Sequence, residues 1–473
     1  MFREILKMLR YFRKFSYKLF GLKMLHVILT IALFFFSFLM FHYGSTANAI
    51  IHFNRFDVIT TVIYTGMVLF FFRTYKSYLL GFNKIRMLVF GQFLSQLISV
   101  VTIYIIISLI WNAFKNPAIF ILMLGLQFVL DMMWSILSTE LYFKLGPKHK
   151  TLLVYRNQVD KFRISGINGS LIRRVYTEHD ELQFDGTFHE LREKLEGYDT
   201  LFVAGLNSRC RNGLLKYCRE NNVDGYILPH IGDTIMMDAE HITAFDAPVL
   251  HVGRKEISPG KAFMKRVCDI LSSGILLTIL SPIMLVIALV IKTSDNGPIF
   301  CRDVRLTRDG REFEMIKFRT TRVKAEKNDT AGSGNGNLED DETTFGKFLS
   351  KWRIDEIPEL INVFKGDMSM VGPKPEKPEI AAMYVEKIPA FRLRQTVKAG
   401  IIGYTQIYGG YDISPYEELE FDLLYIKNMN VLVDMQLFFA SLLTIFKKEY
   451  QREAPPLTRD EVDQEQYYSD LIN

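Results

Sequence analysis

Long apolar runs alternate with short basic or polar stretches in the first third of the chain. Four of these runs approach the length of about 20 apolar residues that a helix needs to cross a membrane. They cover residues 25–41, 57–72, 87–110 and 118–142. We therefore predict a bundle of four transmembrane helices, because core helices of a soluble protein rarely reach these lengths.

Positive charge is distributed unevenly around the four runs. Lysine and arginine gather in the N-terminal tail, between the second and third runs, and directly after the fourth run. The other two loops carry only Arg55 and Lys115. Since Lys and Arg favour the cytoplasmic side of a membrane, everything after Lys144 is predicted to be cytoplasmic. No small-residue cleavage site follows the first run, which favours a membrane anchor over a cleaved signal peptide.

Short β-rich runs alternate with polar helical stretches between residues 147 and 260. Expected strands cover residues 151–155, 171–176, 200–204, 225–228 and 248–252, and expected helices cover 188–195 and 209–221. This alternation predicts a small, parallel, Rossmann-like α/β domain.

The turn after the first of these strands bears on cofactor binding. A dinucleotide site needs G-x-G-x-x-G at that place, whereas residues 156–160 read Arg-Asn-Gln-Val-Asp. Without glycine, nothing lets the backbone approach a pyrophosphate closely. A regulatory or assembly role is therefore favoured over dinucleotide binding.

Another apolar run covers residues 266–292 and holds Ser281 and Pro282 near its middle. Proline removes a helical hydrogen bond and kinks the helix, and each half is too short to span a bilayer alone. Both flanks are basic, from Lys261 before the run to Arg311 after it. Because basic flanks favour the cytoplasmic side, we expect a re-entrant membrane helix that breaks at Ser281-Pro282.

Charge and cysteine content exclude other classes of protein. The formal net charge of +5 over 473 residues is mild, whereas nucleic-acid binders usually carry a strong basic stripe. The four cysteines, Cys210, Cys218, Cys268 and Cys301, form no C-x-x-C pair, so neither a zinc site nor a redox motif is indicated. Their scatter suits free thiols in a reducing compartment.

Residues 353–376 carry the clearest chemistry. Pro358 suits the first residue of a short helix and Gly366 its stop, so Asp355 and Glu356 should lie at the helix N-terminus. The partial positive charge there keeps carboxylates ionised and attracts phosphate. An ionised carboxylate can attack phosphorus, and Mg²⁺ binds one or two carboxylates together with substrate phosphates. Taken alone, the pair would more often be a simple acidic helix cap.

From about residue 265 to residue 446 the chain resembles the monotopic phosphoglycosyl transferases, in the large form that starts exopolysaccharide or capsule repeat units. The four N-terminal helices and the middle α/β domain also match that form. The motifs that carry the resemblance are Lys265-Arg266 with Asp269, Ser281-Pro282, Gly297-Pro298 with Phe300 and Arg302, Lys317-Phe318-Arg319, Arg353-Ile354-Asp355-Glu356-Ile357-Pro358, the stretch from Asn362 to Glu376, and Asp422 with Tyr425.

The resemblance implies a reaction and a site. The enzyme would transfer sugar 1-phosphate from a UDP-sugar to polyprenyl (undecaprenyl) phosphate, giving UMP and a polyprenyl-diphosphate-sugar. Asp355 would be the nucleophile of an aspartyl-phosphosugar intermediate and Glu356 would hold Mg²⁺, with the exchange of these two roles left open. The substrate-binding residues would be Arg302, Arg305, Lys317, Arg319, Pro373, Lys374, Pro375 and Asp422.

The resemblance also implies a cellular location, partners and a domain organisation. The catalytic domain would lie on the cytoplasmic face of the bacterial inner membrane, with downstream glycosyltransferases and a second copy of the chain as partners. The expected organisation is residues 1–146 for the basic tail and four transmembrane helices, 147–260 for the Rossmann-like domain, 261–450 for an α+β catalytic domain with the re-entrant helix 266–292, and 451–473 for an acidic tail.

Three departures from the family pattern concern sugar and phosphate recognition. Lys374 replaces the usual arginine between two prolines, residues 398–403 replace a Pro-Gly-x-Thr-Gly segment, and residues 408–410 replace Asn-Gly-Arg. Two other functions remain alternatives. A catalytically silent membrane scaffold is disfavoured by the intact Asp355-Glu356 pair, and a nucleotide-sugar dehydratase or epimerase by the glycine-free turn.

Two further segments have weaker patterns. Residues 331–337 are rich in Gly, Ser and Asn and lack the Lys-Ser/Thr of a phosphate loop, so a mobile loop near the site is expected. Residues 437–446 are almost wholly apolar, which fits an interfacial helix and a buried core helix equally well.

Overall fold

The computed structural model describes residues 2–44, 54–80, 85–145, 150–158, 160–161, 178–244, 247–253, 257–295, 297–321, 343–408 and 413–444. The chain divides into two compact units, Met1–Leu228 and Pro229–Asn473. The predicted loop at 331–337, the acidic tail 451–473 and residues 409–410 lie outside the described residues. The predicted domain limits stay a prediction.

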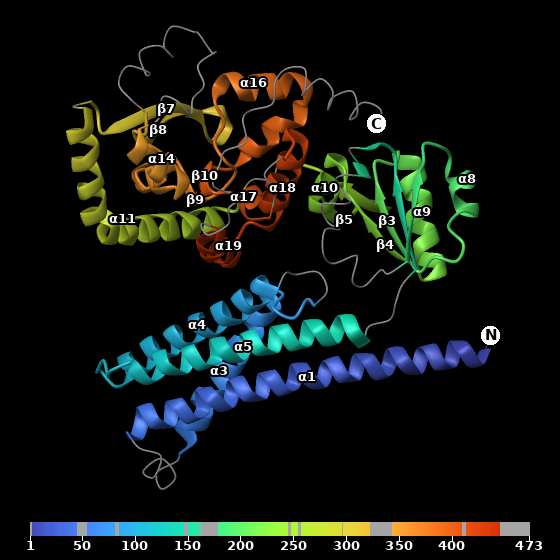
Figure 1. Ribbon diagram of the computed structural model, residues 1–473, viewed down its shortest axis with the longest axis horizontal. Helices are drawn as coiled ribbons and strands as arrows, with labels where there is room; N and C mark the ends of the chain where they lie inside the picture. Colours follow the sequence, from blue (N-terminus) through green and yellow to red (C-terminus); the bar gives the residue numbers. More distant parts are fainter. Residues whose placement is uncertain are drawn as a thin grey trace. The chain divides into compact units, whose positions relative to one another are not determined.

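Four long helices form the N-terminal region and pack against one another (Figure 1). They are α1 (Phe2–Tyr43), α3 (Arg55–Thr74), α4 (Ile85–Ile110) and α5 (Ala118–Leu145). Each holds a segment long and apolar enough to cross a membrane. The four predicted segments are therefore confirmed as membrane-length helices, and the chain is a membrane protein with a helical N-terminal region.

Polar groups inside this bundle are bonded to one another. His26 Nε2 lies 2.9 Å from Asp131 Oδ1, and His26 Nδ1 lies 2.8 Å from the Tyr78 hydroxyl. Gln96 Nε2 donates to the same Asp131 oxygen at 3.0 Å. Since hydrocarbon offers polar groups no water, such groups must be satisfied within the bundle. These contacts tie α1, α4 and α5 together.

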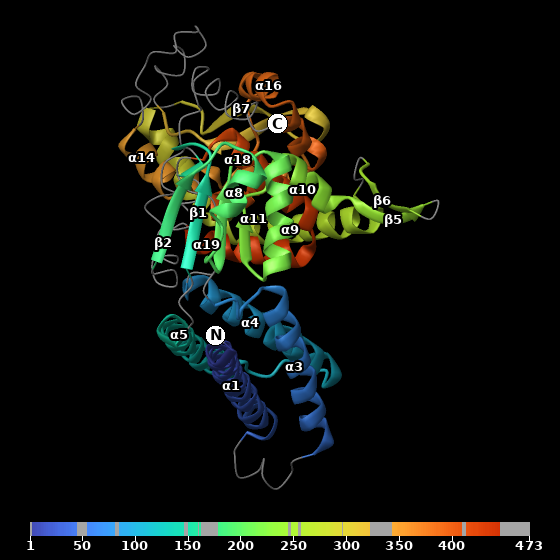
Figure 2. The same cartoon turned by 90° about the vertical axis from the view of Figure 1, so that its right-hand side faces the viewer.

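A four-stranded parallel sheet follows the bundle in the chain, in the order β2-β1-β3-β4. Its strands are β1 (Lys150–Tyr155), β2 (Glu178–Gln183), β3 (Thr200–Ala204) and β4 (Asp224–Ile227), and its helices are α8 (Phe188–Glu193) and α9 (Ser208–Asn221). Leu152 and Val154 pack in one cluster with residues of α8 and α9, whereas Leu153 and Tyr155 pack on the opposite face. Figure 2 shows α8 and α9 beside the strands of this sheet. The predicted parallel sheet is confirmed. The strand expected at 171–176 lies outside the described residues.

The prediction that residues 248–252 join the parallel sheet is wrong. Strand β6 (Ala247–His251) pairs antiparallel with β5 (Glu240–Ala244) in a separate two-stranded sheet. The short connection explains this pairing, because a hairpin needs as few as two connecting residues whereas parallel strands need a long crossover. The preceding helix α10 (Ile231–Asp238), which was not predicted, packs against α18 (Pro415–Asn428) in the second unit.

Helix α11 (Pro259–Asp295) contains Pro282, and Figure 1 shows its ribbon turning sharply between two arms. Thr278 O would pair with the N–H of residue 282, which proline lacks. Ser281 Oγ donates to that carbonyl oxygen at 2.9 Å. Ser281 thus supplies a partner for the freed carbonyl, while re-entry into a membrane stays a prediction.

Both arms of α11 return to the same α/β domain. In the first arm, Arg266 donates to the carbonyl oxygens of Val363 and Phe364 at 2.7 and 2.8 Å. In the second arm, Ile287 and Ile291 are buried in a cluster with Phe318 and Leu349. Between these anchors the helix leaves large apolar side chains exposed, including Ile275, Ile279 and Ile283.

Two small sheets and a set of short helices form the rest of the second unit (Figure 1). The antiparallel pair is β7 (Phe300–Leu306) with β8 (Glu312–Phe318), and the parallel pair is β9 (Ser369–Val371) with β10 (Gly400–Ile402). The helices are α14 (Thr344–Lys351), η2 (Ile354–Glu356), α15 (Glu359–Lys365), α16 (Pro378–Lys387), η3 (Pro389–Thr396), α17 (Tyr404–Tyr408), α18 and α19 (Val431–Thr444), and η1 (Arg308–Gly310) closes the β7–β8 hairpin. This unit is the expected mixed α and β domain.

Candidate active site

The two predicted acids lie on a short 3₁₀ turn. Asp355 and Glu356 belong to η2, and both are partly exposed. Pro358 caps the following helix α15, and Gly366 ends it in the left-handed conformation with φ of 102°. The predicted helix is therefore confirmed to within one residue at its start. We call η2 and the first residue of α15, Glu359, the acid turn.

Asn362 fixes the acid turn against strand β8. Its Nδ2 donates to Glu314 O at 2.7 Å, and its Oδ1 accepts from Ile316 N at 3.0 Å. A side-chain amide supplies both a donor and an acceptor, so Asn362 pairs with the strand edge as a neighbouring strand would. This pairing sets α15 in register with β8 and brings the next strand residue, Lys317, to the acids.

Lys317 contacts two acids of the turn. Its Nζ lies 3.5 Å from Glu356 Oε1 and 3.4 Å from Glu359 Oε1. Arg353 approaches the other Glu356 oxygen, with 3.8 Å between Nη1 and Oε2. Glu356 therefore lies between two cations. The distances of 3.5 Å to Lys317 and 3.8 Å to Arg353 are longer than those of a short ion pair.

Close contact between two glycines shapes the Gly372–Pro375 turn. A Cβ on Gly372 would lie 2.4 Å from Lys398 O, and a Cβ on Gly400 would lie 2.1 Å from Gly372 N. Only glycine lets the two backbones approach this closely. Gly400 N then donates to Pro373 O at 2.9 Å, which fixes the start of the turn that carries Lys374 and Pro375.

A polar hollow brings five of the predicted site residues together. It is lined by Arg305, Met315, Lys317, Glu356, Glu359, Lys374, Pro375, Gly400, Ile401 and Gln406. We call it the basic hollow, because three cationic side chains line it together with two acids of the acid turn. Arg305 is held by Asp303 Oδ2 at 2.8 Å and by Pro375 O at 3.1 Å. Such a site suits a ligand with several phosphate oxygens.

Three predicted residues lie elsewhere in the described structure. Arg302 is exposed and pairs with Glu314 at 2.7 Å across the β7–β8 hairpin. Arg319 is buried, with 4% of its surface exposed. Asp422 is buried and pairs at 2.8 Å with Arg394. Direct contact between these side chains and a substrate stays a prediction.

Arg394 gives Asp422 an indirect connection to the basic hollow. The guanidinium donates to Lys374 O at 3.0 Å and to Glu418 at 2.8 Å. It also lines a neighbouring hollow together with Pro373 and Lys374. Arg394, which is paired with the buried Asp422, therefore holds the backbone of the Gly372–Pro375 turn through its hydrogen bond to Lys374 O.

Glu359 is a site residue that the sequence reasoning missed. Burial raises its pKa to about 8, with a further contribution from the negative charge of Glu356. The available signal was its spacing, because residues three apart on a helical turn share a face. That spacing places Glu359 beside Glu356 against Lys317.

The acid turn offers ligands of the type that Mg²⁺ prefers. Among the described residues, no group of three His, Cys, Asp or Glu side chains could hold a metal ion by itself. Mg²⁺ does not need such a group, since it commonly binds one or two carboxylates together with water and substrate phosphates. The half-buried Glu356 carboxylate, beside Asp355 and the basic hollow, fits this mode.

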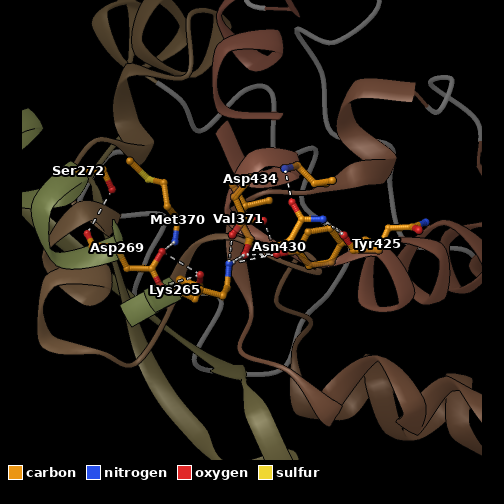
Figure 3. Close-up of polar contacts among 11 residues, drawn as sticks. Lys265, Asp269, Ser272, Met370, Val371, Tyr425, Asn430 and Asp434 are labelled. Carbon is orange, nitrogen blue, oxygen red and sulfur yellow. Dashed lines mark hydrogen bonds and ion pairs between the residues drawn. The ribbon is translucent and has the colours of Figure 1, made fainter. Parts of the chain in front are cut away.

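A second polar cluster fixes the first arm of α11 to strand β9 (Figure 3). Lys265 Nζ donates to Asp434 Oδ2 at 2.6 Å, to the Tyr425 hydroxyl at 3.1 Å and to Val371 O at 3.0 Å. One turn later, Asp269 accepts from Met370 N at 2.9 Å and from Ser369 Oγ. We call this set the anchor cluster, and it holds β9 directly before Gly372.

Comparison with known proteins matches the second unit. The model of the family described as bacterial sugar transferase matches residues 260–448. The Aeromonas hydrophila UDP-N-acetylgalactosamine-undecaprenyl-phosphate N-acetylgalactosaminephosphotransferase is 35% identical over 40% of this chain and 45% of its own length. The Klebsiella pneumoniae UDP-glucose:undecaprenyl-phosphate glucose-1-phosphate transferase is 36% identical over 39% of each chain. The chain thus matches less than half the length of these two relatives.

A shorter relative is matched over most of its length. The uncharacterized sugar transferase EpsL of Bacillus subtilis is 33% identical, and the match covers 39% of this chain and 89% of EpsL. The fold and site define a membrane protein whose α/β domain sets an acid turn against a basic hollow. The chain belongs to the bacterial sugar transferase family.

Proposed function

We propose that the chain transfers a sugar 1-phosphate from a UDP-sugar to polyprenyl phosphate, as the first membrane step of exopolysaccharide or capsule synthesis. The basic hollow carries the proposal, because its cations suit a diphosphate. Asp355 does not line the hollow, but it directly precedes Glu356, which does, and its carboxylate suits attack on phosphorus. The names of the two long relatives, which state a UDP-sugar and undecaprenyl phosphate, support it.

The proposed reaction is a double displacement at phosphorus. An Asp355 carboxylate oxygen forms a bond to the sugar-bearing phosphorus, the bond from that phosphorus to the UMP oxygen breaks, and UMP leaves with the electron pair. An oxygen of polyprenyl phosphate then attacks the same phosphorus. The bond to Asp355 breaks in this step, which returns the free carboxylate and gives the polyprenyl-diphosphate-sugar.

The residues of the hollow would lower the charge barrier to this attack. Lys317, Arg305 and Lys374 would face the phosphate oxygens and offset the repulsion between them and a carboxylate. Glu356 would hold Mg²⁺, which when bound neutralises further charge on those oxygens. Exchanged roles, with Glu356 as nucleophile, are distinguished by intact-protein mass spectrometry of the Asp355→Asn and Glu356→Gln variants.

The arrangement in the membrane is part of the proposal. Both arms of α11 return to one α/β domain, and its apolar side chains between the anchors are exposed. This supports a re-entrant helix that enters and leaves through the cytoplasmic face of the bacterial inner membrane. A helix that crossed the bilayer would separate its two anchors by about 30 Å of hydrocarbon.

We propose that the middle, Rossmann-like domain binds no dinucleotide and serves assembly or regulation. After β1, Asn157 Oδ1 accepts from Asp160 N at 2.8 Å. The Asp160 carboxylate lies where a Cβ on Gly205 would be, within 2.0 Å, so this side chain fills the space beside the end of β3. Downstream glycosyltransferases and a second copy of the chain are the proposed protein partners.

The proposal is tested by incubating the purified full chain with polyprenyl phosphate, Mg²⁺ and a panel of UDP-hexoses and UDP-amino sugars. The expected result is release of UMP and a labelled lipid with at least one donor, and loss of both on chelation of Mg²⁺. A catalytically silent scaffold would release no UMP with any donor, and that outcome would contradict the proposal.

A further inference from the structure

An apolar hollow borders the acid turn at Glu356. Its walls include Leu276 of α11, Ile402 of β10, Ile407 of α17 and Phe438 of α19. Its volume is about 180 Å³, somewhat larger than the apolar cavities of about 150 Å³ that bind benzene. It therefore admits an apolar group of about the size of one isoprene unit.

The apolar hollow and the basic hollow share part of their walls. Glu356, Ile401 and Gln406 line both of them. Two ligands of different character could therefore reach the acid turn in succession, one rich in phosphate and the other with an apolar chain. In a double displacement the acceptor oxygen attacks in line with the bond to Asp355, at the position that UMP has left, so only its apolar chain needs a separate hollow.

Arg353 supplies a cation at this part of the apolar hollow. It lines the hollow beside Glu356, and its side chain is 29% exposed. Its backbone is left-handed, with φ of 54°, which is unusual for a bulky side chain and is often retained at ligand sites. An arginine binds phosphate oxygens with two parallel hydrogen bonds.

The helices that form the hollow also supply the apolar surface of this unit. Helix α11 has a membrane-length apolar segment, and α19 is a shorter apolar helix. Around Leu276, the neighbouring α11 side chains Ile275 and Ile279 are 59% and 63% exposed. A ligand held between α11 and α19 could therefore continue into the lipid phase beside α11.

We propose that the apolar hollow binds the phosphate-proximal isoprene unit of polyprenyl phosphate, with the lipid phosphate bound by Arg353 next to the acid turn. This inference rests on the proposed transferase function and names the site of its second substrate. UDP-sugar occupies the basic hollow, and the lipid approaches from the apolar one. Leu276, Ile407 and Phe438 then select a flexible prenyl chain over a more polar acceptor.

A matched pair of variants tests the lipid site. Leu276→Trp fills the hollow, whereas Ile275→Trp adds the same bulk to the exposed neighbouring position. Two quantities are measured, namely the burst of UMP formed with UDP-sugar alone and the KM for polyprenyl phosphate. We expect Leu276→Trp to keep the burst and raise the lipid KM at least tenfold, while Ile275→Trp stays within twofold of wild type in both.

The outcomes separate the lipid site from the transferase function. An unchanged lipid KM in Leu276→Trp, or an equal rise in Ile275→Trp, overturns the lipid site. Loss of the burst in Leu276→Trp alone overturns it too, since the substitution would then act on the acid turn. The absence of a burst in wild type would contradict the double displacement instead. The KM values of Leu276→Trp and Ile275→Trp for polyprenyl phosphate would then still test whether the apolar hollow binds the lipid.

Arg353 is tested by substitution and by partial rescue. Arg353→Gln should raise the KM for polyprenyl phosphate more than the KM for UDP-sugar, and Arg353→Lys should recover part of the loss, because charge returns without the paired hydrogen bonds. Equal effects on both KM values would overturn this assignment. Photolabelling with a prenyl phosphate that carries a diazirine on its first isoprene unit should mark α11 or α19, and competition by phosphatidylglycerol alone would identify ordinary lipid as the occupant.

Discussion

Glu359 is held in a buried position between a lysine and a second acid. Its carboxyl lies 3.4 Å from Lys317, and burial with the nearby Glu356 charge raises its pKa to about 8. The usual pKa of glutamate in an unfolded chain is about 4.3. Between these two pH values the folded state binds more protons than the unfolded state, so stability falls as the pH rises through this window.

Substitution at this residue should remove that pH dependence. Glu359→Gln keeps the shape and cannot ionise, so its thermal midpoint should exceed that of wild type at pH 8.5 and be close to it at pH 5. Thermal unfolding of the detergent-solubilised full chain measures this, with Glu379→Gln at an exposed position of α16 as the control. A midpoint that follows the wild-type pH profile would contradict the assigned shift.

At the scale of elements, the anchor cluster connects the first arm of α11 with β9 and α19. Lys265, Asp434 and Tyr425 bond to one another, and Lys265 and Tyr425 also donate to Val371 O, as Figure 3 shows. Lys265 and Asp434 are largely buried, with 13% and 16% of their side chains exposed. Removal of one partner leaves an uncompensated charge, which typically costs about 3–5 kcal/mol for a buried pair.

A double-mutant cycle tests this connection. Lys265→Met and Asp434→Asn should each destabilise the chain, and the double variant should lose less than the sum, with a coupling of about 0.5–3 kcal/mol. Denaturant unfolding monitored by tryptophan fluorescence gives the three differences. Lys261→Met, at an exposed position one turn earlier, is the control and should change little. Additive effects within about 0.3 kcal/mol would mean that the two side chains do not interact.

The elements show which parts of the fold a sequence can predict. The membrane-length helices, β1, β3 and α9 were predicted because their apolar periodicity is local. Strand β2 was missed because its sequence, Glu-His-Asp-Glu-Leu-Gln, has little β-propensity and depends on pairing with β1. The antiparallel pairing of β5 with β6 was likewise missed, because composition does not show which strand is the partner.

The same limit applies to the candidate site. Asp355, Glu356 and the cations Arg305, Lys317 and Lys374 could be predicted from motif order, whereas Glu359 was missed. The two hydrogen bonds of Asn362 to β8, and the contact between Gly372 and Gly400, join residues far apart in the chain. The buried pairing of Asp422 with Arg394 is of the same kind. Such contacts depend on the three-dimensional packing, so a residue pattern alone does not reveal them.

For the whole molecule, the charge pattern predicts that both flanks of α11 are on the cytoplasmic side. In a variant without its four native cysteines, single cysteines at Lys261 and Arg311 should resist an impermeant maleimide in intact cells and react after the membrane is opened. Ala113→Cys, in a loop predicted to face outward, is the control and should react in intact cells. Reaction of the cysteine at Arg311 with the maleimide in intact cells would contradict re-entry, because it would place the basic residues after α11 outside the cell.

The central claim is that Asp355 becomes covalently bound to a phosphosugar. The most direct measurement is intact-protein mass spectrometry of the full chain after exposure to UDP-sugar and Mg²⁺ without lipid. We predict a mass increase of one phosphosugar in wild type, which disappears on addition of polyprenyl phosphate. Asp355→Asn should show no adduct, because its amide has the same shape and lacks nucleophilicity, whereas Glu356→Gln should keep the attachment site and react slowly. An adduct that persists in Asp355→Asn and is lost in Glu356→Gln would assign the nucleophile to Glu356, and the absence of any adduct in wild type would contradict the double displacement.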